Sequence, residues 1–369
     1  MPVNSKDVYR GKRSHRRLWT VLLFVLAALI VAAIVLFFAC QKYIVYDSDG
    51  LRVVFPILES AAPSDDETGA PSDDETGAHE SVNVELVYEE PDYSGILSNA
   101  GKNLQAIQAQ YVTADRITPD GLTAAAAQVK SAGGNALVLQ MKAPGGTLSW
   151  KSAVNEAAAY GVNGTAELSE TIQSLKSQDI YLVAVVSCCV DTLMAQRYSA
   201  LALKDSAGAA YSDGSGGWLD PYNETVRSYI VALCKELAAM GFDEIAFSYL
   251  QMPFTDLDFA YAVQMSSAPS RTDAVMNLAQ YLRGALASTG VRVSAVCSAD
   301  SILQQKSAQT GQELTPFTKL FDRICVFADS GNLQQLRSAV AADEAFDAET
   351  RFVPFLAEAQ SSGSYIKTS

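Results

Sequence analysis

From residue 107 onward the sequence alternates short apolar runs with amphipathic stretches, and this alternation limits the possible folds more than any other feature. Most runs are five to seven residues long, as in buried strands, and the stretches between them have helical periodicity. The predicted strands are residues 107–113, 136–141, 180–186, 244–249, 291–296, 323–327 and 351–356, with 365–367 as a fragmentary eighth. The predicted helices are residues 118–132, 165–178, 223–240, 271–288, 313–321 and 333–342.

Seven or eight strands alternating with helices predict an α/β fold, a (β/α)8 TIM-like barrel, which typically takes ~250 residues. A doubly wound open sheet is the alternative, but no GxGxxG turn follows any early strand. Only thirteen residues follow residue 356, too few for an eighth helix, so the sequence leaves open whether the barrel is complete at its C-terminus. If it is open, we expect residues 51–58 to cover the bare edge.

Residues 18–40 are a stretch of 23 residues without a charge, long enough to cross the ~30 Å hydrocarbon layer as a helix. Six Lys and Arg precede it, and only Lys42 follows closely, so the positive-inside rule keeps residues 1–17 in the cytoplasm. A cleaved signal peptide is the main alternative, but its apolar core is typically about 7 to 15 residues long. We therefore predict a single-pass membrane protein with an extracytoplasmic C-terminal domain.

The segment between the predicted span and the barrel divides into two parts. Residues 41–58 are an extracytoplasmic connector with strand-like character. Residues 59–92 hold twelve acidic residues and no Lys or Arg, and repeat the octapeptide APSDDETG in tandem, so they predict a disordered acidic linker.

The formal net charge of the chain is −14, of which −7 belongs to residues 93–369, the predicted barrel domain. Because that domain lacks clustered Lys and Arg, nucleic acid is not an expected partner.

The cysteines and histidines indicate no metal site and no cofactor. The chain has six cysteines without a CxxC motif, and most lie in apolar strand-like runs where Cys acts as a small hydrophobic residue. Both histidines, His15 and His79, precede the barrel. A zinc site or a His-dependent catalytic triad is therefore not expected there.

Two motifs resemble a bacterial family of glycoside-hydrolase-like proteins with a TIM-barrel domain, distantly similar to the α-amylase-like enzymes. They are GWLDPYNETVRSYI at residues 217–230 and GFDEIAFSYLQMP at residues 241–253. The family pattern at the second motif is G-F-D-E-I-x-F-D-Y-x-R-F-P, and weaker similarity covers most of residues 105–360. The resemblance implies a carbohydrate site at the carboxyl ends of the barrel strands.

The sequence departs from this family pattern at charged positions. Ser248 replaces an Asp that is the family's best candidate for a catalytic carboxylate, and Gln251 replaces an Arg. Gln140 and Ala143 replace the acids of a D-x-K-D strand, and Val296 stands where an Asp is expected. Glycosidases need two carboxyl groups about 5 to 5.5 Å apart for retention or about 6.5 to 9.5 Å for inversion. The resemblance therefore implies a catalytically impaired member.

The candidate site residues fall into two groups. Those predicted to bind substrate are Lys142, Trp150, Trp218, Asp220, Ser248, Tyr249 and Gln251. The aromatic residues could stack on sugar rings or serve as buried loop anchors, and Asp220 could instead cap the following helix. If the barrel is active, the candidate catalytic carboxylates are Glu358, Asp300 and Asp329, which follow predicted strands.

The leading hypothesis is a membrane-anchored glycoside-hydrolase-like protein that binds cell-wall or surface polysaccharide without cleaving it. An active glycosidase with relocated carboxylates and a protein-interaction module of the cell envelope are the alternatives. An aromatic groove without paired acids would favour the first, and two facing carboxyl groups the second. A filled barrel mouth with an exposed apolar patch elsewhere would favour the third.

Overall fold

The computed structural model describes residues 44–47, 50–53, 100–263 and 269–368. The chain divides into two compact units, Met1–Leu86 and Val87–Ser369. In the first unit, β1 (Ile44–Asp47) and β2 (Gly50–Val53) form an antiparallel hairpin in which Asp47 lies opposite Gly50. The predicted cytoplasmic tail, membrane span and acidic linker lie outside the described residues. No helix within those residues has the length and apolar character needed to cross a bilayer.

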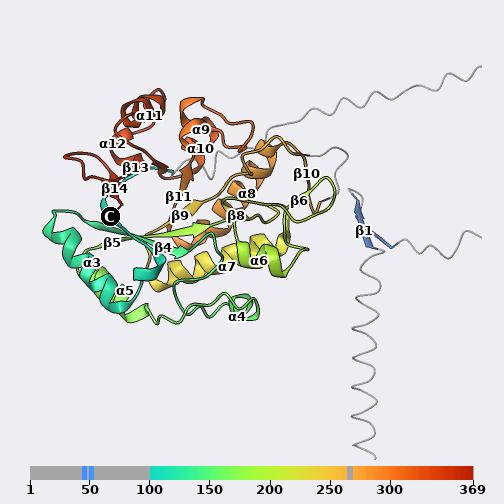
Figure 1. Cartoon of the computed structure of the whole chain (residues 1–369), viewed down its shortest axis with the longest axis horizontal. Helices are drawn as coiled ribbons and strands as arrows, with labels where there is room; N and C mark the ends of the chain where they lie inside the picture. Colours follow the sequence, from blue (N-terminus) through green and yellow to red (C-terminus); the bar gives the residue numbers. More distant parts are fainter. Residues whose placement is uncertain (1–43, 48–49, 54–99, 264–268, 369) are drawn as a thin grey trace, which may run out of the picture. The chain divides into compact units, whose positions relative to one another are not determined.

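Eight parallel strands of the second unit form a closed barrel (Figure 1). They are β3 (Gln108–Val112), β4 (Ala136–Lys142), β5 (Tyr181–Ser187), β9 (Glu244–Ser248), β11 (Arg292–Cys297), β12 (Ile324–Phe327), β13 (Phe352–Leu356) and β14 (Tyr365–Lys367). Each strand pairs with the barrel strands before and after it in the chain, and β14 pairs with β3. The prediction of a TIM-like barrel is confirmed.

The last strand closes the barrel, which settles the question that the sequence leaves open. Tyr365 lies opposite Gln108 of β3, and Ile366 lies opposite Phe355 of β13. The alternative in which the barrel is incomplete at its C-terminus is therefore wrong, because three residues are enough to pair on both sides. Since no edge remains bare, a covering role for residues 51–58 is not needed.

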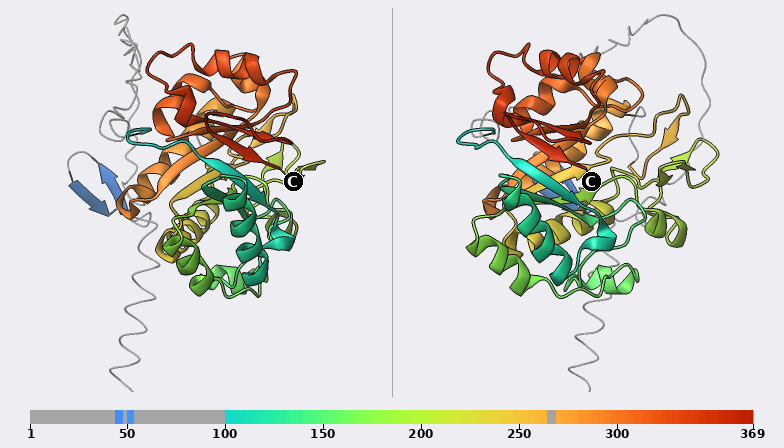
Figure 2. Two further views of the ribbon diagram at one scale, coloured as in Figure 1. Left: turned by 90° about the vertical axis from the view of Figure 1, so that its left-hand side faces the viewer. Right: turned by 60° about the vertical axis from the view of Figure 1, so that its left-hand side comes forward.

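Helices surround the strands, as the views in Figure 2 show. They are α3 (Pro119–Ser131), α4 (Asn155–Ala159), α5 (Ser169–Ser177), α6 (Thr192–Arg197), α7 (Glu224–Met240), α8 (Arg271–Leu286), α9 (Ala299–Leu303), α10 (Leu314–Leu320), α11 (Leu333–Val340) and α12 (Ala348–Arg351). Short 3-10 turns occupy Ala114–Arg116 and Ala287–Thr289. The long helices have the sequence signals that predict them. Asn223 caps α7 at its start, and Gly241 ends it with a φ of 116°.

The loops after β5 and β9 carry short elements that the sequence pattern does not predict. Strand β6 (Lys204–Asp205) pairs with β10 (Phe259–Ala260), and β7 (Ser212–Asp213) pairs with β8 (Gly216–Gly217). These two-residue strands, like the five-residue helices α4 and α9, are too short to show a period, so sequence alternation cannot reveal them.

Helix α5 begins at Ser169, four residues later than predicted.

Two apolar layers form the core, one inside the barrel and one between the barrel and its helices. The inner layer is made mainly of small and β-branched residues such as Ala109, Val138 and Ala246. The outer layer contains larger side chains such as Leu137 and Phe247. Residues of one strand alternate between the two layers, because successive side chains point to opposite faces.

A buried ion pair braces the amino-terminal base of the barrel. Glu244 of β9 and Arg323 before β12 are both almost completely buried and contact each other directly. Glu244 also accepts hydrogen bonds from the hydroxyls of Tyr181, at 2.8 Å, and Ser294. The Arg323 guanidinium donates to the carbonyl oxygens of Thr350 at 3.0 Å and of Gln105 at 2.8 Å. One charge pair thus connects six separate segments of the chain.

We predict that Glu244→Ala lowers the free energy of unfolding by about 3–5 kcal/mol, because it leaves Arg323 buried without a counter-charge. Chemical denaturation of the purified chain measures this change. Lys151→Ala, which breaks the exposed ion pair with Glu167, is the control and should leave stability nearly unchanged. Equal small losses in the two variants would contradict the bracing role.

Candidate functional site

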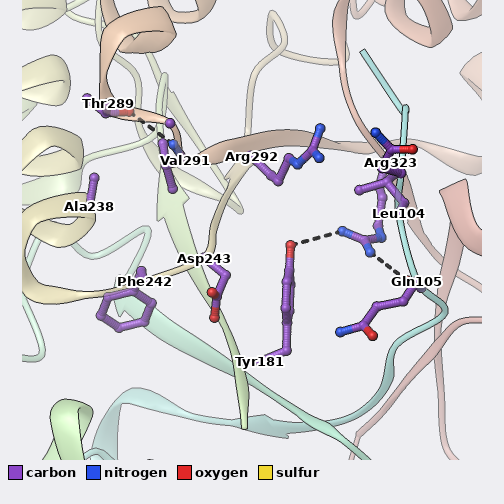
Figure 3. Close-up of a pocket in the computed structure, with 12 residues that line it drawn as sticks. Leu104, Gln105, Tyr181, Ala238, Phe242, Asp243, Thr289, Val291, Arg292 and Arg323 are labelled. Atoms are coloured by element: carbon purple, nitrogen blue, oxygen red, sulfur yellow. Dashed lines mark hydrogen bonds between the residues drawn. The ribbon is translucent and has the colours of Figure 1, made fainter. Parts of the chain in front are cut away.

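Two cavities lie at opposite ends of the barrel. The larger, of about 640 Å³, is at the base, and Figure 3 shows its lining. Its three charged lining residues are already paired: Asp243 with Lys176, Arg292 with Asp322, and Arg323 with Glu244. Figure 3 also shows Arg323 hydrogen-bonded to Tyr181 and Gln105. These charges therefore hold barrel segments together, and the base is the face of a TIM barrel associated with stability.

The second cavity, of about 300 Å³, lies at the carboxyl ends of the strands, where TIM barrels place their ligand sites. We call it the mouth cavity. Its lining comprises Tyr111, Gln140, Pro144, Val185, Ser248, Tyr249, Gln251, Val296, Cys297, Ser298, Phe327 and Phe355. These residues come from the carboxyl-terminal parts of seven different strands or from the loops that follow them. The cavity therefore depends on barrel closure to bring them together.

Aromatic rings form one wall of the mouth cavity. Phe327, the last residue of β12, is 61% exposed and stacks on Phe355 of β13, with ring centroids 4.4 Å apart and planes inclined by 18°. Tyr111 of β3 meets Phe355 edge to face, at 5.7 Å. Phe355 is thus held on both sides, and the exposed Phe327 ring is fixed by stacking. The result is a firm apolar platform that faces solvent.

The chain turns sharply at the end of β9. Tyr249 has a φ of 51°, a left-handed conformation that is uncommon outside glycine. The carbonyls of Ser248 and Tyr249 accept hydrogen bonds from Cys188 and Cys189, at 2.9 and 3.1 Å, which hold this conformation. Trp218 packs edge to face on the Tyr249 ring, at 6.3 Å. Strained residues of this kind often lie at binding sites, where surrounding contacts stabilise them.

The lining of the mouth cavity carries no Asp, Glu, Lys, Arg or His. Burial, together with the smaller effect of the nearby Tyr249 hydroxyl, raises the pKa of Tyr111 to about 12. Burial also raises the pKa of the Cys297 thiol to about 12. Both groups are therefore protonated at physiological pH. The cavity is a neutral environment with apolar walls and hydroxyl, thiol and amide groups.

Ser248, Tyr249 and Gln251 line the mouth cavity, at the carboxyl end of the strand where the sequence predicts them. Gln140 and Val296, two other positions at which the sequence departs from the family pattern, also line it. The lining residues Tyr111, Phe327 and Phe355 are not among the sequence candidates. The only signal for them is their position at the end of an apolar strand.

Lys142 lies in the interior and not on the surface of the mouth cavity. Its ammonium group is 2.9 Å from the Asp191 carboxylate and donates to the carbonyl of Ser187 at 3.0 Å, and both charged side chains are fully buried. A shift in strand register between Gln140 and Lys142 accompanies this placement. Asp191 also caps α6 by accepting a hydrogen bond from Met194. Lys142 therefore ties β4 to the loop after β5.

Trp150 and Trp218 are buried, so neither presents a ring face to solvent. The Trp150 indole donates to Glu236 of α7 at 3.0 Å, which anchors the loop after β4. Asp220 is also buried, and it accepts hydrogen bonds from the amides of Tyr222 and Ala262. Burial raises the pKa of its carboxyl group. The alternative that Asp220 caps α7 is wrong, because Asn223 does so.

The three candidate carboxylates, Glu358, Asp300 and Asp329, are exposed and are absent from the lining of the mouth cavity. Asp329 accepts hydrogen bonds from the amides of Gly331 and Asn332, at 2.8 and 3.0 Å, and so shapes the turn after β12. Over residues 100–263 and 269–368, no group of three or more side chains has the arrangement to hold a metal ion.

Comparison with known proteins agrees with this fold. A family model described as a "putative glycosyl hydrolase domain" matches residues 109–328. The glycoside hydrolase domain of PgaB (BpsB) from Bordetella bronchiseptica has a similar structure. Its TM-score is 0.52, with 15% identity over 68% of this chain and 84% of that one. Identity at this level indicates a shared fold only. No curated protein sequence matches the chain.

Two further structures are similar to part of this chain. A hypothetical protein from Ruminiclostridium thermocellum is 23% identical, with a TM-score of 0.45, over 50% of this chain and 96% of that one. The GH20 β-N-acetylhexosaminidase from Streptomyces coelicolor is 14% identical, with a TM-score of 0.43, over 69% of this chain and 48% of that one. The chain thus spans about half the length of the hexosaminidase.

We predict that Lys142→Met lowers the free energy of unfolding by about 3–5 kcal/mol, because Asp191 is then buried without a counter-charge. Adding Asp191→Asn should recover much of this loss, since the amide oxygen still caps α6 while the charge is gone. Denaturation of the single and double variants tests the pair. If Lys142 were a ligand contact at the mouth, the single variant would instead keep its stability.

Proposed function

The chain belongs to this glycosyl hydrolase domain family, and from that premise we propose that its barrel binds cell-surface polysaccharide through the mouth cavity without hydrolysing it. The observation that carries the proposal is an aromatic cavity at the carboxyl ends of the strands with no acidic residue in its lining. Family membership supports a carbohydrate ligand, and the missing acids argue against hydrolysis.

Sugar binding needs an apolar surface for the ring face and polar groups for the hydroxyls, and the mouth cavity has both. The exposed Phe327 ring, fixed on Phe355, is the stacking surface. Ser248, Gln251 and Tyr249 stand around the same cavity with hydroxyl and amide groups. A volume of about 300 Å³ is at the low end of ligand pockets, which suits one or two sugar rings.

Hydrolysis requires two carboxyl groups on either side of the glycosidic bond. Ser248 could act as a nucleophile only with a neighbouring base, and the cavity lining offers no carboxylate, lysine or histidine. The active-glycosidase alternative would depend on Glu358, Asp300 or Asp329, which project into solvent outside the cavity. The interaction-module alternative is less favoured because the mouth is open and not filled.

We further propose that residues 18–40 anchor the chain in the membrane, with the barrel outside the cytoplasm. The support is the 23-residue uncharged stretch and the six Lys and Arg that precede it. The acidic repeats of residues 59–92 would then act as a self-repelling spacer between the membrane and the barrel. A surface location would place the mouth cavity among cell-wall and capsular polysaccharides.

The binding proposal predicts different effects from two equally exposed phenylalanines. Phe327 is 61% exposed in the mouth cavity, and Phe254 is 63% exposed outside its lining. Calorimetry with a panel of bacterial cell-wall and capsular glycans should show that Phe327→Ala weakens binding about tenfold, or ~1.4 kcal/mol, while Phe254→Ala leaves it unchanged. The native chain should release no reducing ends from any glycan that it binds.

Two outcomes would contradict this proposal. Equal affinities of the two variants and the native chain would exclude the Phe327 platform. Release of reducing ends would mean that hydrolysis occurs, and loss of that release in Glu358→Gln would identify the relocated carboxylate.

The anchoring proposal predicts that the chain stays in the membrane fraction after an alkaline carbonate wash. External protease added to intact spheroplasts should digest the barrel, because it lies outside the cytoplasm. Recovery of the chain in the soluble fraction, or a barrel that is protected until the spheroplasts are lysed, would contradict anchoring with this orientation.

A further inference from the structure

We propose that the mouth cavity selects uncharged sugar residues and rejects sugars that carry a free amine, a carboxylate or a phosphate. This inference rests on the proposed carbohydrate-binding function and specifies its ligand class. It starts from the chemistry of the lining, in which all twelve residues are neutral side chains.

The titratable groups of the wall provide a second observation. The pKa of Cys297 is shifted by burial alone, and that of Tyr111 by burial and by another tyrosine. No Asp, Glu, Lys or Arg of the described chain contributes to either shift. Lys142 and Asp191 form a buried ion pair with each other in the interior, so neither charge is available to a ligand in the cavity. A charged ligand would thus find no counter-ion on the wall.

The polar groups of the cavity suit neutral sugars. The hydroxyls of Ser248, Tyr249 and Tyr111 and the side-chain amide of Gln251 have no hydrogen-bond partner among the residues that the structure describes. The side-chain Oε1 of Gln140 accepts a hydrogen bond from the Ala114 backbone amide at 3.2 Å, which leaves the side-chain NH₂ group as a donor. Hydroxyl and amide groups can donate to and accept from sugar hydroxyls or acetamido groups.

Charge is missing at several independent positions of one cavity. Gln140 of β4, Ser248 and Gln251 at and just after the end of β9, and Val296 of β11 all line the mouth cavity, and none of them carries a charge. An ionised group that enters this cavity loses water without gaining a partner, which disfavours its binding strongly.

The test compares oligosaccharides that share a backbone and differ in charge. The probes are an N-acetylglucosamine oligomer, its de-N-acetylated glucosamine counterpart, a glucose oligomer and a glucuronic acid oligomer. Calorimetry with the full-length chain, in a salt concentration high enough to screen its net charge of −14, gives the four affinities. We expect each neutral oligomer that binds to do so at least about tenfold more tightly than its charged counterpart.

A single substitution should reverse this selectivity. Gln251→Glu introduces a carboxylate into the cavity with little change of shape, and should raise the affinity for the glucosamine oligomer at least about tenfold relative to the neutral one. Gln335→Glu is the matched control. Gln335 is exposed on α11 outside the cavity lining, so this variant has the same net charge and should keep the native preference.

The outcomes separate the two proposals. If neutral and charged oligomers bind equally well, the charge selectivity is wrong while carbohydrate binding stands. If Gln251→Glu and Gln335→Glu shift the preference equally, the effect is one of net charge and not of the cavity, which also overturns the selectivity. If none of the four oligomers binds and the wider glycan panel gives no binding, the carbohydrate-binding function itself fails.

Discussion

Hydrogen bonding between β14 and its two neighbours is the constraint on which the arrangement of the site depends. The amide of Tyr365 donates to the carbonyl of Ile107 at 2.8 Å, and the amide of Thr368 donates to that of Leu356 at 2.7 Å. These bonds join the first and seventh barrel strands through a segment of three residues. Closure brings the ends of β3, β12 and β13 together, which places Tyr111, Phe327 and Phe355 in one aromatic wall.

Charge and neutrality are separated along the barrel axis. At the base, the ion pairs of Glu244 with Arg323 and of Asp322 with Arg292 and Arg283 hold strands and helices together. At the opposite end, the mouth cavity has a neutral lining. Buried charges are tolerated where each has a partner, as at the base, and are costly where a ligand must come and go. This division lets the base stabilise the barrel while the mouth stays open to ligands.

The sequence predicts the strands of this barrel well, because buried parallel strands are short apolar runs between helices with clear caps. Even the short β14 is predicted at its observed bounds. Ser248 and Gln251 could be placed at the mouth for the same reason, since strand ends in a barrel converge. Side-chain environment is harder to predict. From the sequence, Lys142 is predicted to lie at the mouth. In the structure it is buried, because the strand register shifts in β4 and its ammonium group pairs with Asp191, which is far from it in the sequence.

The aromatic wall could not be predicted from sequence, because its contacts join strands that are far apart in the chain. Nothing local to Phe327 shows that Phe355 supports it. The most direct test of the central claim is a crystal structure of the chain with a bound neutral oligosaccharide. We predict a sugar ring stacked on Phe327 with its hydroxyls toward Ser248 and Gln251. A sugar bound elsewhere, for example beside Glu358, with an empty mouth cavity would contradict it.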